Sequence, residues 1–300
     1  MVIPHSVVAF ALVRPHSALA VAVVRPHFTV PVAVGLCLLG FGVGVFGTLV
    51  GAGGGFILTP VLLLVYPTSS PALITAISLI AVFFNAGSGS IAYARQKRID
   101  YRSGVVFALC TLPGSVVGVL LANTIARPGF DVIMGVALTG LAWWLVRGRT
   151  QPSGGDPARG VARTIVDRDG KAYRYHADVR RGALFSVGVG FVSSFLGIGG
   201  GVVHVPLLVT VLGFPTHIAT ATSHFVLAWM ALVATLTHVV IGTFHGAIGL
   251  RRAAALSVGV VFGAQLGAIL SRRLSSAVIQ RLLAFGLLAL GVRLVLSVVL

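Results

Sequence analysis

The feature that most constrains this chain is a glycine-rich segment that occurs twice. It reads GAGGGFILTP at 51–60 and GIGGGVVHVP at 197–206, and both copies lie in long apolar runs without charged residues. Glycine is unfavourable inside a helix and takes positive φ freely, so each segment predicts a helix break. At membrane depth, irregular backbone is tolerated only where it is buried in protein or lines a cavity. We therefore interpret the segments as two broken helices that meet at a transport site.

The composition predicts an all-α integral membrane protein. The chain is 57% hydrophobic and only 9% charged, whereas soluble domains carry about 25% charged residues. The net charge of +16 does not indicate nucleic-acid binding, because the basic residues lie between apolar runs, as the positive-inside rule predicts. All six acidic residues are aspartates, and the two cysteines, Cys37 and Cys110, suggest no disulfide or metal framework. The sequence predicts no cofactor and no bound metal.

Apolar runs predict about eight transmembrane segments in two four-span repeats, with discontinuous helices at the glycine motifs. The runs at 31–66 and 182–212 are too long for one straight crossing, and each contains one motif. We interpret each run as one discontinuous crossing, with a re-entrant hairpin as the main alternative.

The same runs give the domain boundaries. Residues 1–29 form an extension with Pro-His recurring every eleven residues, which we expect to be disordered. Transmembrane repeat 1 covers 30–147 and transmembrane repeat 2 covers 181–300. Between them, 148–180 is expected to be a cytoplasmic linker loop, in which Asp-Gly at 169–170 between β-prone residues predicts a small hairpin.

The resemblance between the halves extends beyond glycine. TAIS at 75–78 matches TATS at 220–223, and both halves contain a Gly-x-x-x-Gly pair, at 114–118 and 263–267. We interpret those pairs as faces for close helix packing. A unit with an even number of crossings begins and ends on the same side of the membrane, so the next unit starts in the same orientation. We therefore expect parallel repeats related by an axis along the membrane normal. Re-entrant motifs would require this symmetry to be revised.

The distribution of Lys and Arg predicts the orientation. With eight crossings, most of the 22 basic residues fall on the cytoplasmic side if the N- and C-termini are both cytoplasmic. The pair Arg272-Arg273 fits this arrangement worst, because it then lies outside. We expect a multi-pass protein of a prokaryotic plasma membrane, in contact with the lipid bilayer; the oligomeric state is not predicted.

The paired motifs at 51–60 and 197–206, with the Ala-x-Ser segments at 76–78 and 221–223, resemble the TauE/SafE family of sulfite-exporter-like permeases. The resemblance covers most of residues 31–300. It implies a transporter of small anions such as sulfite, sulfonates or related organosulfur anions, with export as the expected direction. It implies no enzymatic activity.

The broken helices suggest how an oxyanion would be bound. Consecutive glycine N–H groups and the positive dipole end of the following half-helix favour an anion. Hydroxyl and imidazole groups near the motifs are further candidates, although a Ser or Thr hydroxyl can equally bond to its own helix backbone. The predicted substrate-binding residues are Gly53, Gly54, Gly55, Ser78, Gly199, Gly200, Gly201, Thr222, Ser223 and His224.

Three alternatives accompany this hypothesis. An intramembrane hydrolase using Ser193 or Ser194 with His224 is weakened by the lack of a Gly-x-Ser-x-Gly elbow. An ion channel is weakened for cations because acidic rings are absent. A structural assembly protein would not explain paired broken helices. For the transporter itself, coupling through His224 and simple facilitated efflux are both left as alternatives.

Overall fold

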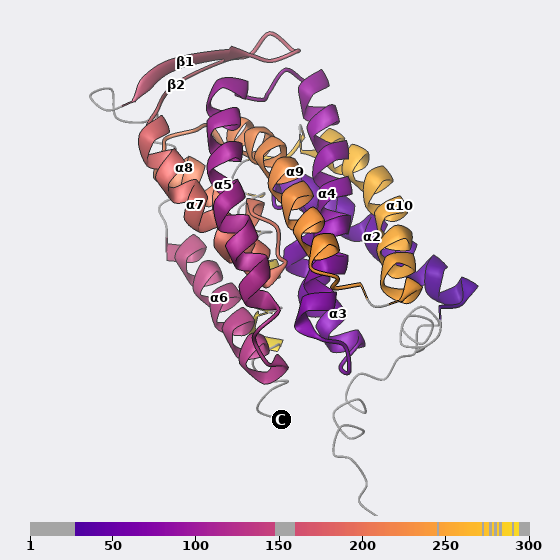
Figure 1. Cartoon of the computed structure of the whole chain (residues 1–300). Helices are drawn as coiled ribbons and strands as arrows, with labels where there is room; N and C mark the ends of the chain where they lie inside the picture. The colour runs from indigo at the N-terminus through magenta and orange to yellow at the C-terminus, as the bar shows by residue number, and fades with distance from the viewer. Residues whose placement is uncertain are drawn as a thin grey trace, which may run out of the picture.

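The computed structural model describes residues 28–147, 160–244, 246–271, 273–275, 278, 281, 284–289 and 291–293. It is a bundle of helices with one two-stranded sheet across one end (Figure 1). The elements are α2 (Val30–Val50), α3 (Gly55–Val65), α4 (Pro71–Arg95), α5 (Tyr101–Ala122), α6 (Arg127–Arg147), β1 (Val161–Val166), β2 (Ala172–Ala177), α7 (Val179–Leu196), α8 (Gly201–Thr210), α9 (Thr216–Val240) and α10 (Ala247–Leu270).

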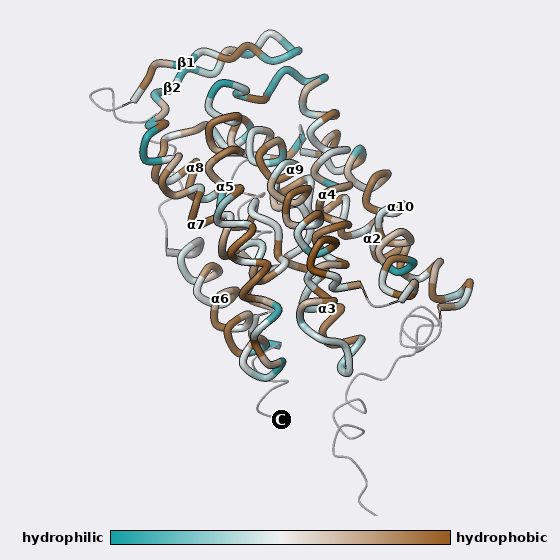
Figure 2. The backbone as a smooth tube through the Cα atoms, in the orientation of Figure 1, coloured by the Kyte–Doolittle hydropathy of each residue, from teal (hydrophilic) through white to brown (hydrophobic). Residues whose placement is uncertain are grey.

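Six of the described helices are long and apolar enough to cross a membrane, namely α2, α4, α5, α7, α9 and α10. Apolar residues run along the helices, and hydrophilic residues gather at the end that carries the sheet (Figure 2). The prediction of an all-α, multi-pass membrane protein is therefore confirmed, whereas a count of eight spans is not. The expected disordered extension lies outside the described residues except for its last two positions, and most of the last predicted span also lies outside them.

Both glycine motifs interrupt a helix, as predicted. α2 ends at Gly51 with φ 85°, and α3 begins after Gly54 with φ 79°. α7 ends at Gly197 with φ 65°, and the second glycine of each motif, Gly53 or Gly199, has φ 74°. A residue with a side chain is strained at such angles, so these turns require glycine.

The direction of each helix follows from contacts at the two ends of the bundle. The end that carries β1 and β2 is called here the hairpin end. There the backbone N–H of Arg168 donates to the carbonyl of Gln96, just after α4, and the Gln96 amide donates to Ala268 near the end of α10. At the opposite end, Arg252 near the start of α10 lies over the ring of Tyr66, just after α3, at 3.8 Å. α4 and α10 therefore both run toward the hairpin end, and α3 runs away from it.

α2 runs parallel to α10, because Gly40 packs on Leu256 and Gly44 packs on Val260. It thus starts at the opposite end, where α3 also finishes. α2 and α3 form a helical hairpin that enters and leaves on the same side, with its glycine turn buried inside the bundle. The re-entrant alternative is therefore correct for this motif, and the prediction of one discontinuous crossing is wrong.

The second motif forms a similar helical hairpin that enters from the opposite end of the bundle. α7 follows directly from β2 and packs parallel to α5, with Gly114 against Val187 and Gly118 against Phe191. α8 returns to the hairpin end, since the Phe214 ring beyond it lies 4.8 Å from a tyrosine ring of β2. The α7–α8 hairpin therefore enters from the hairpin end.

These directions correct the predicted symmetry. The two helical hairpins insert from opposite ends, so the repeats are inverted and related by an axis in the membrane plane rather than along its normal. A re-entrant motif enters and leaves on the same side of the membrane and so does not count as a crossing. Each unit therefore has an odd number of crossings instead of the even number predicted. The described start of the chain, at residues 28–30, and the β-hairpin of the central loop consequently lie at opposite ends, whereas the N-terminus itself lies outside the described residues.

The Gly-x-x-x-Gly pairs interlock the halves. An added Cβ at Gly114 or Gly118 on α5 would overlap the backbone of α7, and one at Gly263 or Gly267 on α10 would overlap that of α2. The first helix of each half therefore packs against a helix of the other half at a distance that only small residues permit.

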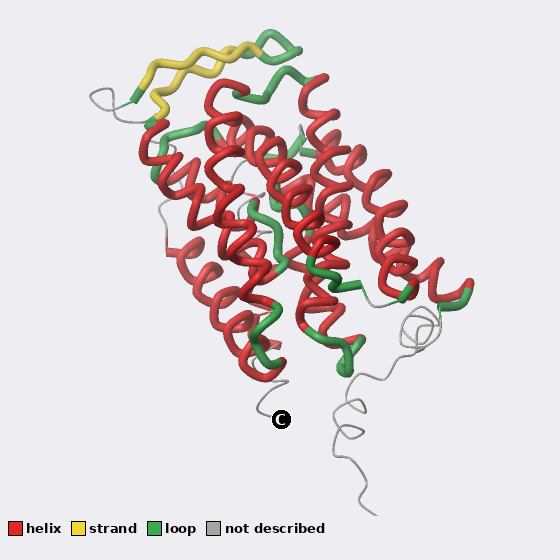
Figure 3. Tube along the Cα trace, viewed as in Figure 1, coloured by secondary structure: helices red, strands yellow, loops and turns green. Residues whose placement is uncertain are grey.

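The central loop contains the predicted hairpin. β1 and β2 pair antiparallel with Val161 opposite Ala177 and Val166 opposite Ala172, and Gly170 in the turn has φ 81°. Figure 3 shows these strands, in yellow, lying across the ends of the helices.

Candidate functional site

The two glycine turns meet inside the bundle. An added Cβ at Gly55 would lie 2.6 Å from the carbonyl of Ile198, and one at Gly201 would overlap the carbonyl of Gly51. The Thr59 hydroxyl also donates to the Gly197 carbonyl at 2.6 Å, which ties α3 to the second turn. The glycines at these positions are required because the two backbones approach each other closely.

All six predicted motif glycines are buried at this meeting point. Gly53 and Gly199 both face Val82 of α4, and Gly53 also faces Leu227 of α9. The structure therefore brings both motifs together, as the sequence predicts, and packs them against the two long helices that run beside them. In this state the turns touch directly, so a ligand between them requires the turns to move apart.

The repeated serines form a reciprocal pair of hydrogen bonds. Ser78 of α4 donates its hydroxyl to the Gly197 carbonyl at 2.8 Å, and Ser223 of α9 donates to the Gly51 carbonyl at 3.4 Å. Each serine thus reaches the glycine turn of the other half. Both hydroxyls are engaged with protein carbonyls in this closed arrangement, so they hold the turns in place.

Each glycine turn leaves backbone donors at the start of a half-helix. The first two N–H groups of a helix have no acceptor within it. In α3 these belong to Gly55 and Phe56, and in α8 to Gly201 and Val202; no hydrogen bond from any of the four is formed with the described part of the chain. Two helix N-termini with free donors thus meet in the apolar interior, where the helix dipole favours an anion.

Thr222 directly precedes Ser223 but contacts α5, where its methyl group would lie 3.3 Å from a Cβ at Gly104. Its hydroxyl oxygen accepts a 3.0 Å hydrogen bond from the backbone N–H of Asp100, the residue that caps α5. The Asp100 carboxylate accepts in turn from the Tyr175 hydroxyl of β2 at 2.8 Å. Burial, together with this carboxylate, raises the pKa of Tyr175 above its usual value. Thr222 therefore links the interior of the bundle to the β-hairpin.

His224 belongs to a buried polar cluster that the sequence prediction did not assemble. Its Nε2 lies 3.3 Å from the Thr48 hydroxyl, which donates to Asn85 Oδ1 at 2.8 Å. The Tyr93 hydroxyl donates to the Thr48 carbonyl at 2.7 Å, and its ring meets the His224 ring edge-on. Gly89 makes room for the imidazole, because a Cβ there would lie 2.5 Å from it. Thr48, Asn85 and Tyr93 carry no sequence motif; only the rarity of polar residues at membrane depth marks them.

The hydrolase alternative is not supported by the geometry. Ser194 Oγ lies 2.8 Å from Ser115 Oγ, while His224 is paired with Thr48. No serine–histidine pair that would activate a nucleophile is therefore present in the described part of the chain. Within the same residues, no group of three His, Cys, Asp or Glu side chains could hold a metal ion.

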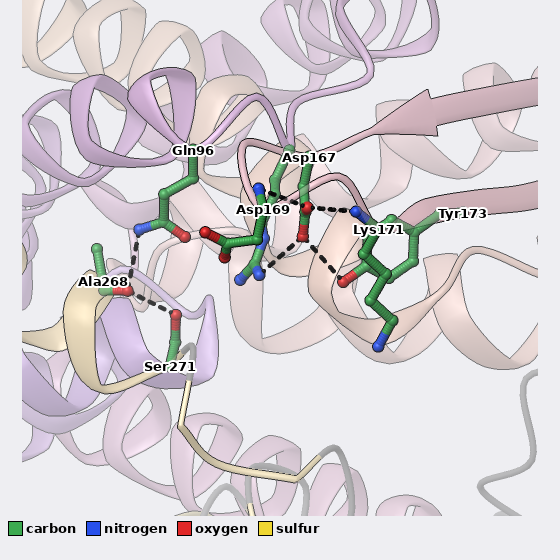
Figure 4. A network of polar contacts seen from close by, with 8 residues as sticks. Gln96, Asp167, Asp169, Lys171, Tyr173, Ala268 and Ser271 are labelled. Carbon is green, nitrogen blue, oxygen red and sulfur yellow. Dashed lines mark hydrogen bonds and ion pairs between the residues drawn. The ribbon is translucent and has the colours of Figure 1, made fainter.

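The β-hairpin is fixed to the helix ends by a buried ion pair. Arg98 Nη2 lies 3.1 Å from Asp167 Oδ2, with side chains only 7% and 1% exposed. Burial alone would raise the pKa of Asp167, but the Lys171 N–H and the Arg98 guanidinium outweigh it and hold that pKa below its usual range. Figure 4 shows the network, in which Asp167 contacts Lys171 and Tyr173 of its own hairpin, while Gln96 and Ser271 form a separate set of hydrogen bonds to Ala268.

The fold and the site together define a class of protein. Opposed helical hairpins with broken tips, buried in a multi-pass bundle built from inverted repeats, are an arrangement used by membrane transporters. The chain belongs to the Sulfite exporter TauE/SafE family, whose family model matches residues 36–294.

Curated relatives are described as membrane transporters. The chain is 28% identical to a probable membrane transporter protein, YunE, of Bacillus subtilis, over 67% of this chain and 76% of the relative. It is 28% identical to a probable membrane transporter protein of Xylella fastidiosa strain 9a5c, over 66% of this chain and 69% of the relative. A probable membrane transporter protein of Methanocaldococcus jannaschii is 27% identical over 58% of this chain and 60% of its own length. No solved structure matches the chain.

Proposed function

We propose that this protein transports small anions, such as sulfite, sulfonates or related organosulfur anions, and that the anion binds at the meeting point of the two glycine turns. The observation that carries the proposal is the convergence of two half-helix N-termini, each with unpaired N–H groups, in the middle of an apolar bundle. Free donors at positive dipole ends stabilise negative charge without requiring a buried cation.

The placement of carboxylates supports an anion rather than a cation. Among the described residues, the aspartates lie at helix starts or in the β-hairpin. Asp100 and Asp178 cap α5 and α7, and Asp131 lies in the first turns of α6, 3.4 Å from Arg127. Cation sites and proton relays in membranes usually rely on carboxylates within the span. The interior described here offers N–H and hydroxyl donors instead.

The reciprocal serine bonds suggest how access alternates. Ser78 and Ser223 each hold the turn of the opposite half, and the turns close on each other. We propose that this is a closed state, in which neither side reaches the site. Parting of the α2–α3 tip would open the site toward one side, and parting of the α7–α8 tip would open it toward the other, as expected for inverted repeats.

The positive-inside rule assigns the hairpin end to the cytoplasm. Basic residues gather there, including Arg95, Lys97, Arg98 and those of the hairpin itself. Arg273, just after α10, also lies at this end, which removes the poorest fit of the earlier topology. The described start of the chain would then lie on the outer side of the cell membrane. An inside-negative potential would drive an anion outward by about 2.3 kcal/mol per charge at 100 mV.

A flux assay tests the proposal. Purified protein in liposomes loaded with radiolabelled sulfite should release it faster when a potassium gradient with valinomycin makes the lumen negative. Sulfonates and small carboxylates, assayed in parallel, would define the substrate range. If none of these anions shows protein-dependent flux, whether or not a potential is imposed, the proposed function is wrong.

A further inference from the structure

The two glycine turns face different side chains. A Cβ added at Gly54 would lie 3.4 Å from Asn85 Nδ2 of α4, whereas a Cβ added at Gly200 would lie 3.3 Å from Met230 Sδ of α9. Asn85 and Met230 occupy equivalent places, since each lies the same number of residues beyond the repeated serine of its helix. The two repeats therefore differ in the side chain that faces each turn, and Gly54 and Gly200 themselves differ in φ, at 79° and −60°.

The Asn85 amide is held at one atom and left unpaired at the other. Asn85 is fully buried, and its Oδ1 accepts the Thr48 hydroxyl at 2.8 Å. Its Nδ2 is buried and has no acceptor within the described part of the chain. Thr48 is itself held by its contact with His224 Nε2 at 3.3 Å. An unsatisfied buried donor is unfavourable, so an amide fixed in this orientation is suited to a ligand that supplies the missing acceptor.

Backbone donors converge on the same place. The N-terminus of α3, a helix of 11 residues, begins at the turn that Asn85 Nδ2 faces. The N–H groups of Gly55 and Phe56 have no acceptor among the described residues. A small oxyanion has several acceptor oxygens and can bind the side-chain amide and the backbone groups together.

The equivalent place in the second half offers weaker chemistry. Met230 presents a thioether, which donates no hydrogen bond. Ser193 Oγ is also buried without a partner in the described chain and would lie 3.5 Å from a Cβ at Gly200. A serine hydroxyl within a helix can rotate to bond a backbone carbonyl one turn earlier, whereas the Asn85 amide is held in its orientation at Oδ1 by the Thr48 hydroxyl.

We propose that Asn85 is the specificity-determining residue for the transported anion, and that it forms a one-sided oxyanion subsite with the first N–H groups of α3. This inference rests on the proposed function and deepens it. The subsite takes a small oxyanion of the sulfite or sulfonate type. All its donors are neutral, so the anion is recognised by hydrogen bonds and is released more readily than from a buried cation.

The test is the concentration dependence of sulfite flux in proteoliposomes. Asn85→Asp keeps the size of the side chain but replaces the donor with a negative charge, so the KM for sulfite should rise at least about tenfold. Met230→Leu and Ser193→Ala are the matched controls in the other half, and each should stay within about twofold of the wild-type KM. Thermal unfolding of each purified variant checks that the fold is retained.

The outcomes separate the two proposals. If the Asn85→Asp variant transports sulfite with the same KM as the wild type, the subsite is wrong and the proposed function stands. The same conclusion follows if Ser193→Ala changes the KM more than Asn85→Asp does. Absence of flux from the wild type overturns the proposed function itself. If Asn85→Asp does not reach the membrane, Thr48→Val removes the hydroxyl that orients the amide. Its KM should rise about three- to tenfold, and an unchanged KM would contradict the subsite.

Discussion

The two glycine turns share most of their backbone features but differ at the glycine before the half-helix, where Gly54 has φ 79° and Gly200 has φ −60°, and in their surroundings. Both end a helix in the left-handed region, both begin a half-helix with free donors, and both accept a hydroxyl from a serine of the other half. They differ in the side chain that faces them, an asparagine amide in the first half and a methionine thioether in the second. Duplication thus explains the scaffold and the two-sided access, whereas recognition of the substrate can be concentrated in one half.

The largest expected effect comes from breaking what the turns share. Gly55→Leu and Gly201→Leu would each drive a side chain into the backbone of the opposite turn, so both should abolish sulfite flux in proteoliposomes. Gly87→Leu is the control, because nothing lies within 4 Å of a Cβ at that position. Retained flux in either turn variant would contradict the direct contact between the halves.

The next prediction concerns the β-hairpin, which packs on the end of the bundle from which the second helical hairpin enters. Asp167→Asn leaves the Arg98 guanidinium buried without a counter-charge and should lower the free energy of unfolding by about 3 kcal/mol. Asp178→Asn is the control, because that carboxylate pairs with Arg181, whose side chain is 50% exposed, and its loss should lower the free energy of unfolding by about 1 kcal/mol or less. Chemical denaturation in detergent measures both variants.

The same ion pair predicts a dependence on pH. The pKa of Asp167 is lower in the folded state than its ordinary value, so the ion pair contributes fully above that ordinary value, which is about 3.9. Its contribution is lost as the pH falls through the lowered, folded-state pKa. Wild type and Asp167→Asn should therefore converge in stability at acid pH; a constant difference down to that range would argue against the ion pair.

A smaller effect should distinguish the reciprocal serines. Ser78→Ala removes a 2.8 Å hydrogen bond and should lower the free energy of unfolding by about 1 kcal/mol, whereas Ser223→Ala removes a 3.4 Å contact and should lower it less. Ser257→Ala is the control, because within the described part of the chain that hydroxyl bonds to its own helix alone, at Ala253. If Ser223→Ala were the more destabilising variant, the relative strengths of the two serine hydrogen bonds would not be those that the structure indicates.

Local chemistry made part of this fold predictable. Glycine clusters in apolar runs predict breaks, and the breaks are at Gly51 and Gly197. Asp169-Gly170 predicts a hairpin turn, and β1 and β2 flank it. These predictions succeed because each depends on the backbone preference of a few neighbouring residues.

Helix direction was not predictable in the same way. A broken helix that continues and one that returns have the same apolar pattern, and only contacts such as Arg252 over Tyr66 distinguish them. The count of basic residues on each side was misleading because it assumed that each broken helix continues across the membrane. The poor fit of Arg272-Arg273 was a signal of this error.

The candidate site shows the same limit. The glycines and the repeated serines were identified from sequence because they recur. Asn85 and Thr48 do not recur, since the second half has Met230 and Ser194 at the equivalent positions. Their pairing spans two helices, and a single sequence contains no signal for that contact.

The most direct test of the central claim is the position of a bound anion. Selenite has the shape and charge of sulfite, and selenium can be located by its anomalous scattering in crystals grown in lipid. We expect one selenium peak where the N-termini of α3 and α8 meet, within hydrogen-bond distance of Asn85 Nδ2 and of the N–H groups that begin α3. A peak confined to the arginines of the hairpin end, in protein that transports sulfite, would contradict the account.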